Sequence, residues 1–345
     1  NRTYDGWWGH DTLPKLNYEN SEKLVEYILN VARKWVSPPY SIDGWRLDVA
    51  ADLGHTAEYN HEFWRRFRQA VKEANPEALI LAEHYGDPAS WLEGDQWDSI
   101  MNYDAFMEPV TWFLTGMEKH SDSYNGGIWG DGEAFFNAMG YHMSRMQTNT
   151  VMTAMNQLSN HDHSRFLTRT NQMVGRIQTA GPEKAGQNIK PCVFREAVVI
   201  QMTWPGAPTL YYGDEAGVCG WTDPDSRRTY PWGKEDLELI EYQKIAYGRM
   251  FGKYQAVAVI SNSPDSQTMD IPVWQLGVTD DMVLGRPILT AETGYNAGVM
   301  LYRIKNGMLK LNMPPYSAAV FVSQPDEFYP VVDSRFADDG AAVEK

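Results

Sequence analysis

The regular alternation of amphipathic and apolar segments along the first 215 residues is the feature that most limits the fold of this chain. The amphipathic segments have the length of helices, and the apolar segments between them have the length of buried strands. Helices are predicted over 21–36, 57–75, 133–149 and 193–204, and strands over 42–50, 78–83, 98–103, 151–158 and 208–212. Such alternation is typical of βαβ units with a parallel sheet. Each predicted strand ends in polar or acidic residues, which is where α/β barrels carry their chemistry.

The first two helices have clear boundaries in the sequence. Ser21 precedes an apolar stripe at Leu24, Ile28 and Val31, and Pro38-Pro39 follows it, so we expect a helix between these limits. The second helix is expected to end at Asn75-Pro76.

The pattern changes near residue 255, where short alternating strands replace the helices. Asn306-Gly307 between two of them is a strong hairpin signal. We therefore predict three parts: an α/β portion over 1–250, an all-β sandwich domain over 251–323 and an acidic tail over 324–345.

Composition excludes several classes of protein. The net charge of −15 disfavours nucleic acid or an anionic membrane surface as the main partner. Two cysteines exclude a disulfide scaffold, and no apolar run reaches the roughly 20 residues of a membrane helix. Aromatic residues make up 13% of the chain. They indicate either a large packed core or a surface on which sugar rings stack.

Three acidic residues follow predicted strands. Asp48 ends GWRLD, Glu83 ends ALILAE, and Asp162 follows the strand at 151–158. Arg46 and Asp48 share one face of their strand, so they are either part of a site or a buried ion pair that orders the barrel. Glu83 is either a simple strand-end contact or a desolvated carboxyl with a raised pKa, suited to general acid catalysis.

The segment Asn160-His161-Asp162-His163 contains two possible metal ligands in alternate positions, His161 and His163. No third ligand has motif spacing, so we favour His161 as a hydrogen-bond donor to a hydroxyl over metal ligation. Two carboxylates and a third acid at neighbouring strand ends suit glycoside hydrolysis. The residues by themselves do not identify the sugar.

Five segments, in order along the chain, resemble the α-amylase family of glycoside hydrolases (family 13). GWRLDVA, ILAEHYGD and QLSNHDHSR resemble the motifs of the fourth, fifth and seventh barrel strands. GAPTLYYGDEAG and DPDSRRTYPW resemble the eighth-strand segment and the loop after it. LPKLN at 13–17 is close to a motif of the neopullulanase, cyclomaltodextrinase and maltogenic amylase branch, and parts of the chain are similar to amylopullulanases.

The resemblance implies a (β/α)8 TIM barrel and assigns roles to residues. It implies Asp48 as nucleophile, Glu83 as acid/base and Asp162 as transition-state stabiliser. It also implies Arg46 orienting the nucleophile and His161 binding glucosyl hydroxyls. Other loop residues where subsites would form, each with packing as the alternative, are Trp7, Trp8, His84, Trp221, Trp232, Asp225 and Arg228.

The resemblance implies a retaining hydrolase of α-1,4-linked glucans such as starch, maltodextrin, cyclodextrin or pullulan, with α-1,6 bonds as a further target. The alternatives are an α-glucan transferase of the same family and a non-catalytic sugar-binding homologue, although such homologues usually lose one of the acids. No cofactor is expected for the chemistry, and Ca²⁺ is expected at most as a structural ion. An extracellular location is expected, with a cytoplasmic one as the alternative.

Two departures from the family pattern stand out. The chain has equivalents only of barrel strands 4–8, so we expect strands 1–3 to come from an N-terminal piece of the same enzyme. The segment ELIEYQKIAYGRM at 238–250 is shorter than the eighth helix and connector of the family.

Overall fold

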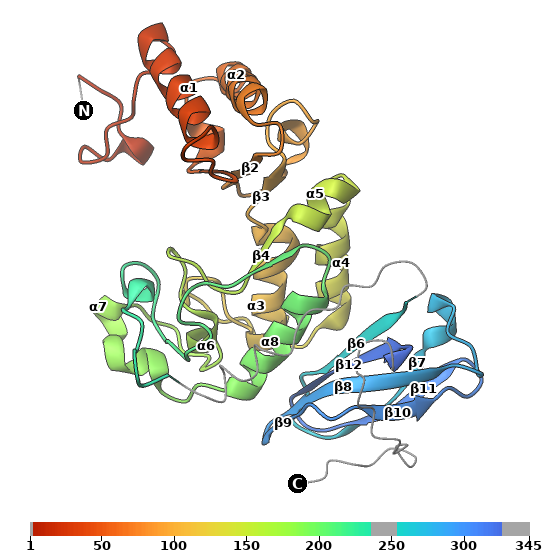
Figure 1. Cartoon of the computed structure of the whole chain (residues 1–345). Helices are drawn as coiled ribbons and strands as arrows, with labels where there is room; N and C mark the ends of the chain where they lie inside the picture. The colour runs from red at the N-terminus through yellow and green to blue at the C-terminus, as the bar shows by residue number, and fades with distance from the viewer. Residues whose placement is uncertain (1–2, 236–253, 326–345) are drawn as a thin grey trace. The chain divides into compact units, whose positions relative to one another are not determined.

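The computed structural model describes residues 3–235 and 254–325, and these form two compact units (Figure 1). The first unit comprises residues 1–105 and 138–156, and the second comprises residues 106–137 and 157–345. The short segment at 238–250 and the acidic tail after residue 325 lie outside the described residues. The predicted domain boundary near residue 250 stays a prediction.

The first unit is built on a parallel sheet in the order β1-β2-β3. An isolated parallel bridge from Met101 to Met155 continues this order to the start of β4. The elements are α1 (Glu22–Val36), β1 (Gly44–Leu47), α2 (Ala57–Ala74), β2 (Leu79–Ala82), β3 (Ser99–Ile100) and α5 (Thr148–Thr153). The predicted parallel α/β pattern is therefore confirmed here.

Helices α1 and α2 begin and end close to the predicted residues. The Ser21 hydroxyl accepts the Leu24 N–H at 3.3 Å, and the Thr56 hydroxyl accepts the Tyr59 N–H at 3.2 Å, so both N-termini are capped by side chains. The buried face of α1 is rotated by one residue from the prediction, however. Its fully buried residues are Val25, Leu29, Ala32 and Val36.

One hydrophobic core joins these two helices to the sheet. From α2 it contains Phe63, Trp64 and Phe67, and from the strands it contains Leu47 and Ile80. This packing fixes α2 as the crossover between β1 and β2, and thereby sets where the two strands end.

The second unit contains a helical part and a β-rich part. The helical part holds α3 (Glu108–Thr115), α6 (Phe166–Arg169), α7 (Ile177–Ala180), α8 (Pro191–Thr203) and β5 (Ala207–Thr209). Two elements, α4 (Gly132–Met143) and β4 (Met155–Gln157), have residues in both units. Among the described residues, no helix is both long and apolar enough to cross a membrane.

Two predicted elements differ from the structure. The helix predicted over 133–149 ends at Met143, and Gln147 has an extended conformation before α5 begins. The strand predicted over 151–158 is shorter, because residues 148–153 form α5 and only Met155–Gln157 form β4.

The β-rich part consists of two antiparallel sheets, as expected for a sandwich. One sheet has the order β10-β8-β12-β6 with β9 on β8, and the other pairs β11 with β7. The strands are β6 (Ala256–Ser261), β7 (Gln267–Pro272), β8 (Val283–Ala291), β9 (Gly294–Asn296), β10 (Met300–Arg303), β11 (Met308–Met313) and β12 (Ser317–Ser323). Asn306 and Gly307 both have positive φ in the tight turn between Lys305 and Met308. The turn is thus confirmed, but the strands on its two sides belong to different sheets.

Candidate active site

The carboxyl ends of β1 and β2 bring two of the predicted acids together. The strands are in parallel register with Leu47 beside Ala82, and the Glu83 N–H donates to the Leu47 carbonyl at 2.9 Å. Asp48 and Glu83 are the next residues of the two strands, so both leave the sheet at the same edge.

Arg46 joins the two carboxylates. Its Nη1 pairs with Asp48 Oδ1, and its Nη2 lies 3.2 Å from Glu83 Oε2. Burial acts to lower the pKa of Arg46, but the hydrogen bond to Asp48 and the charge of Glu83 outweigh it and the pKa is raised. The guanidinium therefore stays charged and holds both carboxylates on its own side.

The two carboxylates have different surroundings. The Glu83 side chain is 11% exposed and also accepts the Val49 N–H at 2.9 Å, whereas the Asp48 side chain is 76% exposed. The exposure of Asp48 argues against the alternative of a buried, purely structural ion pair with Arg46. The predicted rise in the pKa of Glu83 stays a prediction.

His84 follows Glu83 in a partly buried aromatic setting. Its Nε2 lies 3.2 Å from the Asp87 carbonyl oxygen, and its ring lies 5.6 Å from that of Trp97. Burial lowers the pKa of His84, so the imidazole is neutral at pH 7. A neutral imidazole next to the acid/base candidate suits hydrogen bonding to a hydroxyl.

In the second unit, Asp162 lies in a tight loop after β4. The side-chain oxygen of Asn160 accepts the N–H groups of Asp162 and His163, each at 3.0 Å. The Asp162 side chain is 34% exposed and has His161 Nε2 at 3.4 Å and Arg227 Nη2 at 3.6 Å. The loop thus presents a carboxylate and an imidazole side by side.

A buried arginine, Arg165, follows this loop in the chain and connects it to two other loops. Arg165 donates to the carbonyls of Tyr212 and Ser226 at 2.7 and 3.0 Å, and pairs with Asp214 at 3.0 Å. Burial raises the pKa of Asp214 to about 6, although the charge of Arg165 acts in the opposite direction. Arg165 therefore ties three loops of this unit together.

Three of the predicted substrate-binding residues contact one another. Arg228 donates to both Asp225 oxygens at 3.0 and 2.8 Å, and Asp225 also accepts the Trp221 N–H at 2.8 Å. Trp221 is fully buried, and its indole N–H donates to the Gly181 carbonyl at 2.9 Å. The burial favours the packing alternative for Trp221, whose ring has no exposed face.

The N-terminal loop and the loop near residue 232 each present an exposed tryptophan. Trp8 is 70% exposed and Trp232 is 81% exposed, while Trp7 is partly covered by the Lys15 ammonium, 4.5 Å from its ring. Trp8 and Trp232 can therefore stack on a ligand. Lys15 of the LPKLN segment also donates to the Asp52 carbonyl at 2.7 Å, which fixes the N-terminal loop within its unit.

His163 is not placed as a metal ligand. It is fully buried, and burial together with the nearby positive charges of His120, Arg169 and Lys119 lowers its pKa to about 2. Among the described residues, no group of three His, Cys, Asp or Glu side chains could hold a metal ion. His161, its neighbour, is 35% exposed and contacts Asp162 instead.

The burial of His163 predicts a pH dependence of stability. The unfolded chain takes up a proton near pH 6.5, whereas the folded chain does so only near pH 2. Stability is therefore complete above pH 6.5 and falls with decreasing pH, by up to about 1.4 kcal/mol per pH unit. Urea unfolding gives the free energy of unfolding at each pH. Between pH 6.5 and 4.5 this free energy should fall less steeply with decreasing pH in His163→Gln than in the wild type. The exposed His10→Gln is the control and should behave like the wild type, so an equal pH dependence in the two variants would contradict the prediction.

The structure adds site residues that the sequence patterns did not reveal. Arg227 forms an ion pair with Asp162, and the Thr222 hydroxyl donates to the Asp162 carbonyl. The three predicted acids fall into two groups: Asp48 and Glu83 with Arg46 in the first unit, and Asp162 with His161 in the second.

Paired carboxylates are the arrangement that glycosidases use for hydrolysis, and the family comparison points the same way. Residues 4–270 match the alpha amylase catalytic domain, so the chain belongs to the α-amylase family. It is 33% identical to neopullulanase 2 of Thermoactinomyces vulgaris over 338 residues, covering 89% of this chain and 49% of that protein. It is 29% identical to an amylopullulanase of Thermoanaerobacterium saccharolyticum, covering 99% of this chain and 25% of that protein.

The fold is similar to that of solved structures. The debranching enzyme of Nostoc punctiforme matches with a TM-score of 0.69 and 25% identity, over 93% of this chain and 66% of that one. The chain thus spans about half the length of neopullulanase 2 and a quarter of that of the amylopullulanase.

Proposed function

We propose that this chain carries the catalytic acids of a retaining α-glucan hydrolase. The observation that carries the proposal is the contact of one guanidinium, that of Arg46, with both Asp48 and Glu83 at adjacent parallel strand ends. A planar group that touches both carboxylates keeps them close together, as a double displacement requires. Membership of the α-amylase family supports the same reaction.

In this mechanism the exposed Asp48 attacks the anomeric carbon and forms a covalent glycosyl ester. Glu83 protonates the departing glycosidic oxygen, and then accepts a proton from the water that hydrolyses the ester. The different burial of the two side chains fits these roles, since the nucleophile must reach the sugar and the acid benefits from a desolvated position. Asp162 would stabilise the positive charge of the transition state, and His161 would bind a glucosyl hydroxyl.

The proposal includes an architecture. The chain would supply strands 4–8 of a (β/α)8 barrel, and a preceding piece of the same enzyme would supply strands 1–3. The greater length of the matched relatives supports this proposal.

The substrates are proposed as α-1,4-linked glucans, with α-1,6 bonds as a second target, because the relatives are named neopullulanase and amylopullulanase. An extracellular location is proposed as well. A structural Ca²⁺ would need ligands from outside the described residues, since these hold no group of three side chains that could bind a metal ion.

The stereochemistry of the product tests the proposal. The protein is incubated with maltotriose, pullulan or cyclodextrin, and the first product is followed by ¹H NMR before it mutarotates. We expect the α-anomer, as retention requires. Initial release of the β-anomer would overturn the double displacement.

A further inference from the structure

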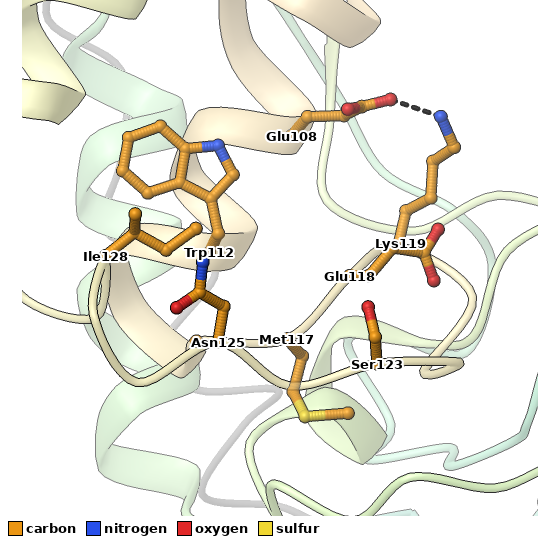
Figure 2. A pocket seen from close by; sticks show the side chains of 9 residues that line it. Glu108, Trp112, Met117, Glu118, Lys119, Ser123, Asn125 and Ile128 are labelled. Carbon is orange, nitrogen blue, oxygen red and sulfur yellow. Dashed lines mark hydrogen bonds and ion pairs between the residues drawn. The ribbon is translucent and has the colours of Figure 1, made fainter.

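A cavity of about 250 Å³ lies in the second unit beside α3 and the loop that follows this helix (Figure 2). Its apolar wall is formed by Trp112, Met117 and Ile128. The polar residues that line it are Glu108, Glu118, Lys119, Ser123 and Asn125. None of these side chains belongs to the candidate active site.

The polar groups of the cavity are held in place by the protein. The Glu118 carboxylate accepts the N–H groups of His120 at 2.8 Å and Asp122 at 3.3 Å. The side-chain oxygen of Asn125 accepts the Gly127 N–H at 2.9 Å, so its amide nitrogen is the end left to donate. Groups that are fixed before binding cost less ordering when a ligand arrives.

The charges of the cavity favour a neutral ligand. Figure 2 shows the Lys119 ammonium in an ion pair with Glu108 at one side, with the Glu118 carboxylate nearby. An anion would meet two carboxylates, and a metal cation would meet the ammonium. A neutral ligand with several hydroxyl groups can accept from Lys119 and Asn125 and donate to Glu118.

The Trp112 ring supplies the remaining element of recognition. It stands on the opposite side of the cavity from Glu118 and Lys119 (Figure 2). A flat ring on one side and fixed hydrogen-bonding groups on the other match the C–H face and the hydroxyl edge of a pyranose. The volume lies just below the ~300–1,000 Å³ of pockets for larger ligands, which suits a single ring.

We infer that this cavity is an accessory binding pocket for one glucosyl unit, separate from the site that cleaves the glucan. The identity of the sugar as glucose rests on the proposed function, whereas the choice of a neutral pyranose rests on the cavity itself. The pocket lies close to the Asp162 loop in the same unit, because the Lys119 carbonyl accepts the Ser164 N–H at 3.2 Å. A glucan held here is thereby kept close to that loop.

The test follows the indole N–H signal of Trp112 in ¹⁵N-tryptophan-labelled full chain during titration with methyl α-glucoside. The signal is identified by its loss in Trp112→Phe. We expect a saturable shift with a dissociation constant on the order of millimolar, as is usual for a ligand of about a dozen heavy atoms. Asn125→Ala and Glu118→Gln should each weaken binding about fivefold or more.

Asn296→Ala is the matched control, because Asn296 is also exposed and its side-chain oxygen accepts the Gly298 N–H at 3.0 Å in the same way. The inference would be overturned if the Trp112 signal did not move at about 100 mM methyl α-glucoside, a hundred times the expected dissociation constant. It would also be overturned if the acyclic sorbitol moved the signal equally. Equal affinities in Asn125→Ala and Asn296→Ala would overturn it as well.

Hydrolysis of maltotriose by the complete enzyme, in which strands 1–3 are present, separates this inference from the proposed function. A Trp112 shift without hydrolysis would leave the pocket in place and count against the proposed function. Hydrolysis without a Trp112 shift would support the proposed function and count against the pocket.

Discussion

Replacing Asp48 by asparagine is expected to lower kcat for maltotriose hydrolysis by about 10⁴- to 10⁶-fold, the range found when a covalent nucleophile is removed. The amide keeps the shape of the side chain but cannot form the glycosyl ester. Because the Asp48 side chain is 76% exposed, the free energy of unfolding should change little. The measurement is kcat by reducing-sugar release, together with a urea unfolding curve.

Asp270→Asn is the control for this substitution, since Asp270 is 53% exposed on β7 and its Oδ1 lies 3.9 Å from the Lys310 ammonium, far along the chain from the candidate site. Its kcat should equal that of the wild type. If Asp48→Asn retained a tenth of the wild-type kcat, Asp48 would not be the nucleophile.

Replacing Glu83 by glutamine should have the second largest effect. We expect kcat for maltotriose to fall about 10²- to 10⁴-fold, because the leaving oxygen then departs without a proton. An activated aryl maltoside needs no protonation, so its first step should be nearly unaffected. Azide should restore turnover by attacking the glycosyl ester in place of water.

This substrate dependence distinguishes an acid/base from a structural residue. Loss of Glu83 as a partner of Arg46 and Val49 would disturb every substrate equally, and azide would then have no effect. Glu73→Gln, an exposed substitution on α2, is the control and should leave both substrates unchanged.

Local signals in the sequence predicted the first unit well. Ser21 marks the start of α1, and the prolines mark the ends of α1 and α2, because caps and breakers act within a few residues. The predicted buried face of α1 differs by one residue from the observed one, because the apolar stripe of this helix is broad. Which edge of the stripe becomes fully buried depends on the packing of α1 against α2. The parallel pairing of β1 with β2 agrees with the crossover through α2 that joins them.

The sequence was less informative around residue 150. Val151 and Thr153 favour a strand by propensity, yet both lie in α5, because a short apolar run does not separate strand from helix. Thr150 and Val151 are buried in α5, and the Ser99 hydroxyl of β3 donates to the Thr150 carbonyl at 3.3 Å, so tertiary contacts accompany the helix there.

In the candidate site, too, residues within local sequence motifs could be predicted, whereas contacts between distant positions could not. Arg46, Asp48 and Glu83 could be predicted because each stands at a strand end within a recognisable segment. Arg165 could not, since its partners Tyr212 and Asp214 follow it by 47 and 49 residues. No local pattern encodes such a contact, and the burial of a charged side chain becomes visible only in three dimensions.

The register of β1 against β2 bears on how this half of the catalytic apparatus forms during synthesis. The contact from Val49 to Glu83 spans 34 positions, and a single crossover through α2 closes it. Contacts of such short sequence separation form quickly, and the N-terminal parts of a chain fold first as it leaves the ribosome. Arg46, Asp48 and Glu83 can therefore meet as soon as β2 is made, before the strands of the β-rich part exist. Insertions or substitutions in segments after β2 would leave the contact between Asp48, Arg46 and Glu83 intact. Binding surfaces formed by those later segments can therefore change in evolution while the two acids stay in place.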